Sequence, residues 1–180
     1  AELFKTAFIG GRAMFDFIQT HHAAMFAGEG AALAEGIDRA VQVKAAVVEQ
    51  EERESGARAL LNFGHTFAHA FEHYFGYDAI MHGEAVLWGM ACALELGRRI
   101  GTVTRESWEE YQPLREMLPL PQLPHADIDI DSIYDAMFSD KKVTDGTLRF
   151  VVPTSPGLSE VRGGVGEQDV RAAISQTLVV

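Results

Sequence analysis

Helical periodicity over nearly the whole chain is the feature that most limits its possible folds. Strand character is convincing only in "TLRFVVP", near residues 147–152. The sequence therefore predicts a mainly α, multihelical fold with a small β element, organised as a single domain over residues 1–180. The predicted helices cover residues 1–9, 12–26, 37–53, 57–74, about 82–99, 104–118, 132–139 and 167–177.

Two predicted helices carry more specific expectations. Residues 37–53 place apolar side chains on one helical face, as in an amphipathic helix. Asp131 is the expected N-cap of the helix over 132–139. The apolar positions of the helix over 37–53 are Ile37, Val41, Ala45 and Val48.

Composition limits the class of protein. With 180 residues, of which 47% are apolar, the chain is long enough to bury a core. No run of 18 apolar residues occurs, so we expect no membrane span, and we find no pattern of an export signal. The single cysteine, Cys92, cannot form an internal disulfide, which favours a reducing cytoplasm.

The formal net charge of −11 argues against nucleic acid as a partner, because a phosphate backbone would be repelled. A small anionic substrate stays possible, since a few cations in one cleft can outweigh the global charge locally. Lysine is scarce on this acidic chain, so the few lysines are candidates for a specific role. They are Lys5, Lys44, Lys141 and Lys142.

Histidines concentrate in residues 61–90, which hold four of the seven in the chain. His65 and His69 are four apart and therefore lie on one helical face. His82 begins the next predicted helix after a short connection, so the chain can double back and bring it beside His65. A polar stripe on the predicted helix over 57–74, begun by Glu54 just before it, runs through Glu54, Arg58, Asn62, His65, His69 and then Glu72 or His73.

These histidines alone leave two interpretations open. Neutral imidazole is the commonest transition-metal ligand, and catalytic zinc sites typically use three protein ligands with one open position. The histidines could equally be ordinary surface or core residues. A metal site would need a further ligand, ideally a carboxylate. A zinc protease of the HExxH type is excluded, because Thr66 follows His65.

The segment "ESGARALLNFGHTFAHAFEHYFGYDAIMHGEAV", residues 54–86, closely resembles the 3-dehydroquinate synthase family. That family carries the motif E-x-G-x-R-x-x-L-N-x-G-H-T-F-x-H-A-x-E, followed by a histidine before G-E-A-V. The opening "AELFK" and "SDKK" at 139–142 resemble the family as well, so the resemblance extends over essentially the whole chain.

The resemblance implies a domain organisation. Members of the family have an N-terminal α/β domain that binds NAD and a C-terminal helical domain that holds the metal and most of the substrate site. This chain shows no Gly-rich nucleotide loop and no βαβ alternation. We therefore expect it to be the C-terminal domain only, with the NAD-binding domain missing, and to be inactive by itself.

The resemblance also implies site residues. A Zn²⁺ or Co²⁺ ion is expected on Glu2, His65 and His82. The imidazole nitrogens of His65 and His82 should then lie within about 6 Å of each other. Residues expected to bind or act on the substrate are Lys5, Lys44, Arg58, Asn62, His69, Lys141 and Lys142, with His69 near the substrate phosphate. One of the last two lysines matches the family's D-K-K lysine. Glu54 is expected to pair with Lys44 or Arg58.

The reaction implied is the conversion of 3-deoxy-D-arabino-heptulosonate 7-phosphate to 3-dehydroquinate with loss of phosphate, a carbon–oxygen lyase step of the shikimate pathway. In this family NAD transiently oxidises a hydroxyl, phosphate leaves by β-elimination, and an aldol closes the carbocycle. The metal serves as a Lewis acid and NAD carries the redox chemistry.

Three alternatives compete with this interpretation. A related sugar-phosphate cyclase or a metal-dependent polyol dehydrogenase would share the histidines, and a non-catalytic helical metal-binding module would need no substrate. The run R-x-x-L-N-x-G-H favours 3-dehydroquinate synthase over the two enzymes. A homodimer is possible.

Overall fold

The computed structural model describes residues 1–51, 56–124, 127–139 and 147–178. The elements in these ranges are α1 (Glu2–Ile9), α2 (Arg12–Phe26), α3 (Gly30–Glu51), the 3-10 helix η1 (Ala57–Asn62), α4 (His65–Phe75), α5 (His82–Arg99), α6 (Arg105–Met117), α7 (Ile130–Ala136), the 3-10 helix η2 (Met137–Ser139), β1 (Arg149–Pro153), β2 (Ser159–Gly163) and α8 (Glu167–Leu178). The predicted mainly helical class is confirmed.

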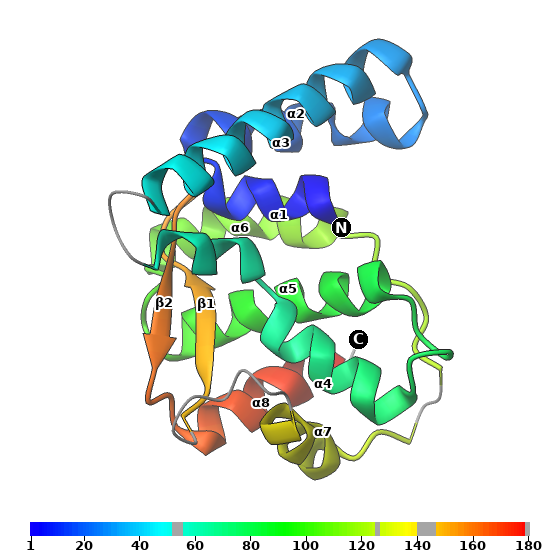
Figure 1. The fold of residues 1–180 in the computed structure, drawn as a ribbon, viewed down its shortest axis with the longest axis vertical. Helices are drawn as coiled ribbons and strands as arrows, with labels where there is room; N and C mark the ends of the chain where they lie inside the picture. The colour runs from blue at the N-terminus through cyan, green and yellow to red at the C-terminus, as the bar shows by residue number, and fades with distance from the viewer. Residues whose placement is uncertain (52–55, 125–126, 140–146, 179–180) are drawn as a thin grey trace.

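α5 is the helix around which the lower part of the molecule is built. α4, α8 and β1 pack against it, whereas α1, α2 and α3 pack on one another. Figure 1 shows α2 and α3 at one end of the long axis and α7 and α8 at the other, with α5 between them. Every residue of α5 from Ala85 to Gly97 is buried, which explains why this stretch is apolar nearly all round.

A two-stranded antiparallel sheet forms the β element. β1 pairs with β2 in the register that sets Arg149 opposite Gly163 and Pro153 opposite Ser159. The strand predicted near 147–152 is therefore confirmed, with its start two residues later. β2 was not predicted, because "SEVRG" lies mostly exposed at the sheet edge and has no alternation of apolar residues.

The predicted continuous helix over 57–74 is wrong. η1 ends at Asn62, and α4 begins at His65 after Gly64, whose φ of 81° belongs to the left-handed region. The break has a tertiary cause, since Gly64 touches the backbone of α5. A Cβ added at Gly64 would lie 2.8 Å from the Met90 nitrogen, and one added at Gly89 would lie 2.1 Å from the Gly64 oxygen.

The N-cap of α7 also differs from the prediction. Asp129, not Asp131, caps this helix, because its carboxylate accepts a hydrogen bond from the Asp131 backbone N–H at 3.0 Å. Asp131 lies inside the first turn and forms an ion pair with Arg171 of α8. The two helices at this end of the molecule are thereby joined.

α3 begins seven residues before the predicted start at 37, and most of its surface is exposed. Its buried residues are Gly36 and Val47. The apolar face of this amphipathic helix is largely open, with Val41 61% exposed and Ile37 51% exposed. Apolar periodicity thus predicted a helix in this region but not its first seven residues, and it does not show what covers the apolar face.

None of the helices that the structure describes is long and apolar enough to cross a membrane.

Candidate metal and substrate site

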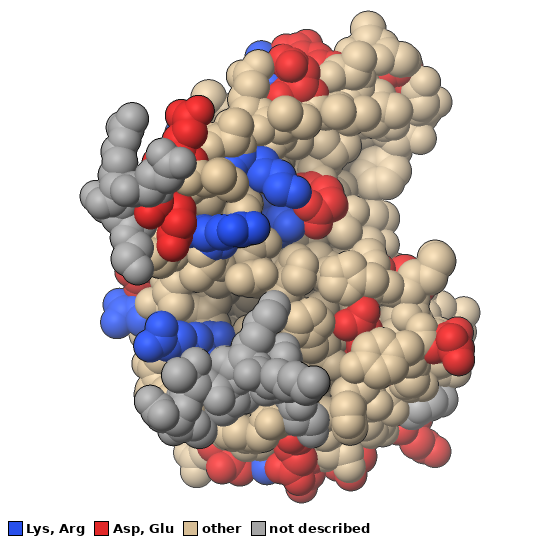
Figure 2. All heavy atoms as spheres, in the orientation of Figure 1, with Lys and Arg blue, Asp and Glu red and all other residues tan. Residues whose placement is uncertain are grey.

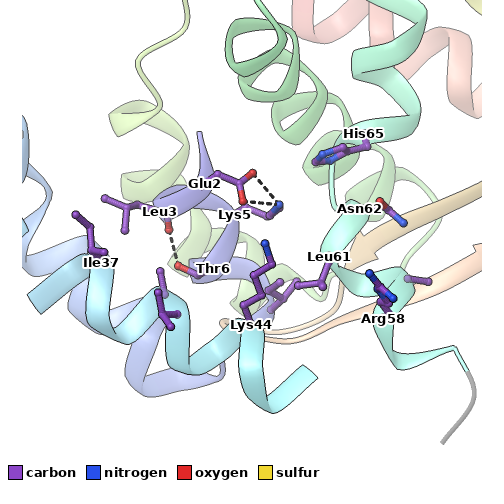
Figure 3. Close-up of a pocket in the computed structure, with 14 residues that line it drawn as sticks. Glu2, Leu3, Lys5, Thr6, Ile37, Lys44, Arg58, Leu61, Asn62 and His65 are labelled. Atoms are coloured by element: carbon purple, nitrogen blue, oxygen red, sulfur yellow. Dashed lines mark hydrogen bonds and ion pairs between the residues drawn. The ribbon is translucent and has the colours of Figure 1, made fainter. Parts of the chain in front are cut away.

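A cavity of about 780 Å³ opens between α1, α3 and η1 and reaches the first residue of α4. Figure 3 shows how these elements contribute to it. Lys5 comes from α1 and Lys44 from α3, and their charged ends point toward each other. Arg58 and Asn62 come from η1, and the His65 ring borders the same space.

Positive charge gathers at this cavity on a protein of net charge −11. Its described lining holds three cations, Lys5, Lys44 and Arg58, against one carboxylate, Glu2, which leaves a formal charge of +2. Figure 2 shows a group of blue atoms where α3 meets the rest of the molecule, with red atoms beside it, and a second blue group at the lower left. The cavity is therefore suited to a small anion.

Glu2 and Lys5 form an ion pair within one turn of α1. The Lys5 Nζ lies 2.8 Å and 3.0 Å from the two Glu2 carboxylate oxygens. Burial alone would raise the pKa of Glu2, but the hydrogen bond and positive charge of Lys5, together with His65 and Lys44, leave it below its ordinary value. Glu2 is thus held as a carboxylate, the form that ligates metals.

His65 and His82 come together from two different helices. Their ring centroids are 5.3 Å apart, with an interplanar angle of 66°. Two imidazoles on one tetrahedral zinc ion, with Zn–N bonds of about 2.1 Å, have centroids roughly 5 Å apart. The spacing of the two ring centroids is therefore compatible with a shared ion.

The Nδ1 atoms of both rings face oxygen acceptors. The His65 Nδ1 lies 3.2 Å from the Phe63 carbonyl oxygen, and the His82 Nδ1 lies 2.8 Å from a carboxylate oxygen of Glu72. Such acceptors fix the N–H on Nδ1 and leave the lone pair on Nε2. Burial lowers the pKa of His65, assisted by the charge of Lys5 and opposed by the Phe63 carbonyl, which favours the neutral, ligating form.

Glu2, the first residue of α1, lines the same cavity as His65. A Cβ added at Gly83 would lie 3.9 Å from the Cβ of Ala1, so the N-terminal ends of α1 and α5 are neighbours. In the described residues no group of three His, Cys, Asp or Glu side chains is already arranged as a complete metal site. Glu2 instead contacts Lys5. A carboxylate and two imidazoles are nevertheless a donor set that suits zinc or cobalt.

His69 lies one turn along α4 and borders a second, smaller cavity of about 190 Å³. Asn62 and His65 line both cavities, whereas Lys44 and Arg58 line only the larger one among the described residues. The centroid of His69 is 5.9 Å from that of His65 and 6.2 Å from that of His82. The structure thus gathers Lys5, Lys44, Arg58 and Asn62 around one space and places His69 beside it.

Three of the residues singled out from the sequence, Glu54, Lys141 and Lys142, lie outside the described residues.

Two acidic residues contact this region without having been assigned a role from the sequence. The Glu51 carboxylate accepts hydrogen bonds from the backbone N–H groups of Gly56 and Arg58, at 3.0 Å and 2.7 Å. Glu72 accepts one from His82. Glu72 could have been found from the sequence, because it continues the polar stripe of His65 and His69. Glu51 could not, because it ends α3 and its partners lie at the start of η1.

The sequence model of the family described as 3-dehydroquinate synthase C-terminal matches residues 1–143. Two curated proteins called 3-dehydroquinate synthase, from Aliivibrio fischeri strains MJ11 and ATCC 700601 / ES114, are each 39% identical to the chain over 176 residues. These alignments cover 98% of the chain and 49% of each relative, so the chain spans about half the length of the curated relatives that it matches.

Solved structures show the same fold. 2-epi-5-epi-valiolone synthase ValA from Streptomyces hygroscopicus subsp. jinggangensis 5008, with NAD⁺ and Zn²⁺ bound, superposes with a TM-score of 0.80 at 25% identity, over 98% of this chain and 49% of that one. 2-deoxy-scyllo-inosose synthase, complexed with carbaglucose-6-phosphate, NAD⁺ and Co²⁺, gives 0.64 at 20% identity, over 80% of this chain and 41% of that one. Since the family match covers most of the sequence, the chain belongs to the 3-dehydroquinate synthase C-terminal family.

Proposed function

We propose that this chain supplies the metal- and substrate-binding half of a 3-dehydroquinate synthase. The observation that carries the proposal is the cavity at which Lys5, Lys44 and Arg58 gather beside the paired rings of His65 and His82. The 39% identity to proteins of that name supports this function over the other cyclases.

The substrate, 3-deoxy-D-arabino-heptulosonate 7-phosphate, carries a phosphate and a carboxylate. The cavity's cations offset these charges, and guanidinium and ammonium groups form the stronger, charge-assisted hydrogen bonds with them. Asn62 can donate and accept at sugar hydroxyls, and we propose that His69, which lines the adjoining smaller cavity, contacts the phosphate. Lys141 or Lys142 completes the set by the resemblance alone. Phosphate would then leave from a site where its negative charge is already balanced.

We propose Glu2, His65 and His82 as the metal ligands. The acceptors at Nδ1 of both imidazoles leave Nε2 for the ion, and Glu2 would exchange its contact with Lys5 for a bond to the metal. When bound, Zn²⁺ or Co²⁺ would polarise substrate hydroxyls as a Lewis acid. Lys5, once released from Glu2, would be free to contact the substrate. The same exchange would therefore provide a ligand for the metal and a cation for the substrate.

NAD is the second cofactor of the proposal, and it would supply reversible hydride transfer. ValA was solved with NAD⁺ over a chain about twice as long as the matched region. We therefore propose that the nicotinamide is held mainly by sequence outside these 180 residues, and that the 180 residues alone do not turn over.

The proposal places the protein in the carbon–oxygen lyases of aromatic amino acid biosynthesis, in the cytoplasm. Cys92 is the single cysteine of these 180 residues and cannot form a disulfide within them, which favours a reducing compartment. The acidic net charge disfavours nucleic acid as a partner. We also propose a homodimer as its assembly.

The deciding experiment is phosphate release by the full-length gene product with 3-deoxy-D-arabino-heptulosonate 7-phosphate, NAD and Zn²⁺. We expect turnover that a chelator abolishes and Zn²⁺ or Co²⁺ restores. No release with this substrate, together with turnover of another sugar phosphate, would assign the protein to a sister cyclase. Metal binding without turnover of any of them would support the non-catalytic module.

A further inference from the structure

Glu72 is a buried carboxylate that does not line either cavity described above. It lies on α4, seven residues after His65, and is only 7% exposed. Burying a carboxylate is costly unless it is paired and hydrogen-bonded. Its Oε1 lies 2.8 Å from the His82 Nδ1. An ionised carboxylate can only accept, so this contact requires the hydrogen on Nδ1 of His82.

His82 depends on this contact more than a buried histidine would. It is the first residue of α5, and its side chain is 55% exposed. The backbone beneath it is fixed, because the Glu84 carboxylate accepts from the Met81 N–H at 2.9 Å. Rotation of the ring is not fixed by packing to the same degree. Glu72 is therefore the group that selects one orientation and one tautomer of the ring.

His65 provides a comparison within the same pair. Its Nδ1 faces a neutral carbonyl, that of Phe63, at 3.2 Å, and its ring is half-buried. A carboxylate acceptor makes an imidazole a better electron donor than a carbonyl does, and such partners commonly contribute 10–100-fold to metal affinity. The two histidines are thus oriented by acceptors of different charge.

We propose that Glu72 is a positioning residue: it holds His82 in the Nδ1–H tautomer with Nε2 directed toward the metal, and it raises the affinity of the site. The inference rests on the metal site of the proposed function and adds to it a residue outside the ligand set. It predicts that loss of the Glu72 charge weakens metal binding although no ligand has been removed.

Glu72→Gln, Glu72→Ala and His82→Ala test this in the full-length protein, with Glu95→Gln as the matched control. Glu95 is also 7% exposed and forms an ion pair, with Arg98, but it lies roughly 20 Å along α5 from His82. Zn²⁺ affinity is measured by competition with a chromophoric chelator. The tautomer of His82 is read without metal from long-range ¹H–¹⁵N correlations of ¹⁵N-histidine-labelled protein, with His82→Ala giving the assignment.

We expect Glu72→Ala to lower Zn²⁺ affinity 10–100-fold and to shift His82 away from pure Nδ1–H. Glu72→Gln, which keeps an acceptor oxygen but not the charge, should fall between Glu72→Ala and wild type, and Glu95→Gln should match wild type. In the His82→Ala background, Glu72→Gln should have no further effect. This last result separates positioning of His82 from a general loss of structure.

The failures are distinguishable. If wild type binds Zn²⁺, His82→Ala weakens it, and Glu72→Gln and Glu72→Ala leave affinity and tautomer unchanged, the positioning role is wrong and the metal site stands. If wild type and His82→Ala bind Zn²⁺ equally poorly, the proposed metal site is wrong, and the role of Glu72 ends with it. Should Glu72→Ala not fold, Glu72→Gln and the double variant decide the matter.

Discussion

α5 and α3 present two contrasting ways of carrying functional residues. α5 is buried without interruption from Ala85 to Gly97, and it places His82 at its exposed first residue. α3 is longer but buries only Gly36 and Val47, and it carries Lys44 over the open cavity. The histidines are thus positioned by core helices, whereas Lys44 lies on an exposed outer helix and Lys5 is buried on α1. We call the surroundings of His65 and His82 the metal side of the site, and those of Lys44 and Arg58 the anion side. We infer that the metal side is rigid and that substitutions on the anion side cost little stability.

The same substitution in the two helices should give the largest difference. Gly89→Ala in α5 would put a Cβ 2.1 Å from the Gly64 carbonyl oxygen, a backbone atom that cannot yield without moving α4. We expect a loss of at least about 3 kcal/mol in the free energy of unfolding. Gly30→Ala at the start of α3 meets nothing within 4 Å and should change stability by no more than about 1 kcal/mol, in the stabilising direction. Urea unfolding of both variants measures this.

A comparable loss in both glycine variants would contradict the contrast between the helices. Because Gly64 directly precedes His65, Gly89→Ala should also weaken Zn²⁺ binding wherever the variant still folds. Gly30→Ala should leave Zn²⁺ affinity unchanged.

Substitutions on the anion side should lower ligand affinity with little effect on stability. Lys44→Ala and Arg58→Ala each remove an exposed cation of the cavity, so the affinity for inorganic phosphate should fall about 10-fold or more. The free energy of unfolding should change by less than about 0.5 kcal/mol. Titration calorimetry with phosphate, paired with urea unfolding, separates the two effects. Arg105→Ala, an exposed arginine paired with Glu109 on α6, serves as the control.

Unchanged phosphate affinity in both Lys44→Ala and Arg58→Ala would remove the cavity as the anion site. Equal weakening by Arg105→Ala would show that only overall charge matters.

The sequence predicted most where local patterns decide the outcome. The bounds of α5 follow from its continuous apolar run and the glycine after it, and the closeness of His65 and His82 follows from two helices joined by a short reversal. The break at Gly64 could not be predicted, because its cause is a contact with Gly89, which is remote in sequence. The exposure of Val41 could not be predicted for a similar reason, since periodicity shows which residues share a face but not what covers it.

Contacts that depend on a single side-chain partner were equally out of reach. Glu51 could not be assigned from the sequence, because its partners lie across a break between two helices. Its interaction predicts a pH-dependent change in stability that is smaller than the previous two effects.

The N–H groups of Arg58 and Gly56 hold the pKa of the Glu51 carboxyl below its ordinary value of 4.5. As pH falls below about 4.5, the unfolded chain takes up this proton before the folded chain does, so the stabilisation is present above that pH and is lost as pH falls through the folded pKa. Wild type should therefore lose stability more steeply in acid than Glu51→Gln. Urea midpoints at a series of pH values measure this, with exposed Glu49→Gln on the same helix as control. Parallel curves for wild type and Glu51→Gln would show that the contact of Glu51 with these N–H groups does not contribute.

The smallest effect is expected on the exposed apolar face of α3. Val41 is 61% exposed, so Val41→Ser removes little buried surface and should change the free energy of unfolding by less than about 0.5 kcal/mol. Val86 on α5 is 1% exposed, and Val86→Ser both loses buried methyl groups and buries a hydroxyl, which should cost more than about 2 kcal/mol. The pair compares identical chemistry in the two helices. If Val41→Ser proved as costly as Val86→Ser, the apolar face of α3 would have to be covered in solution, and the contrast between a rigid metal side and an open anion side would not hold.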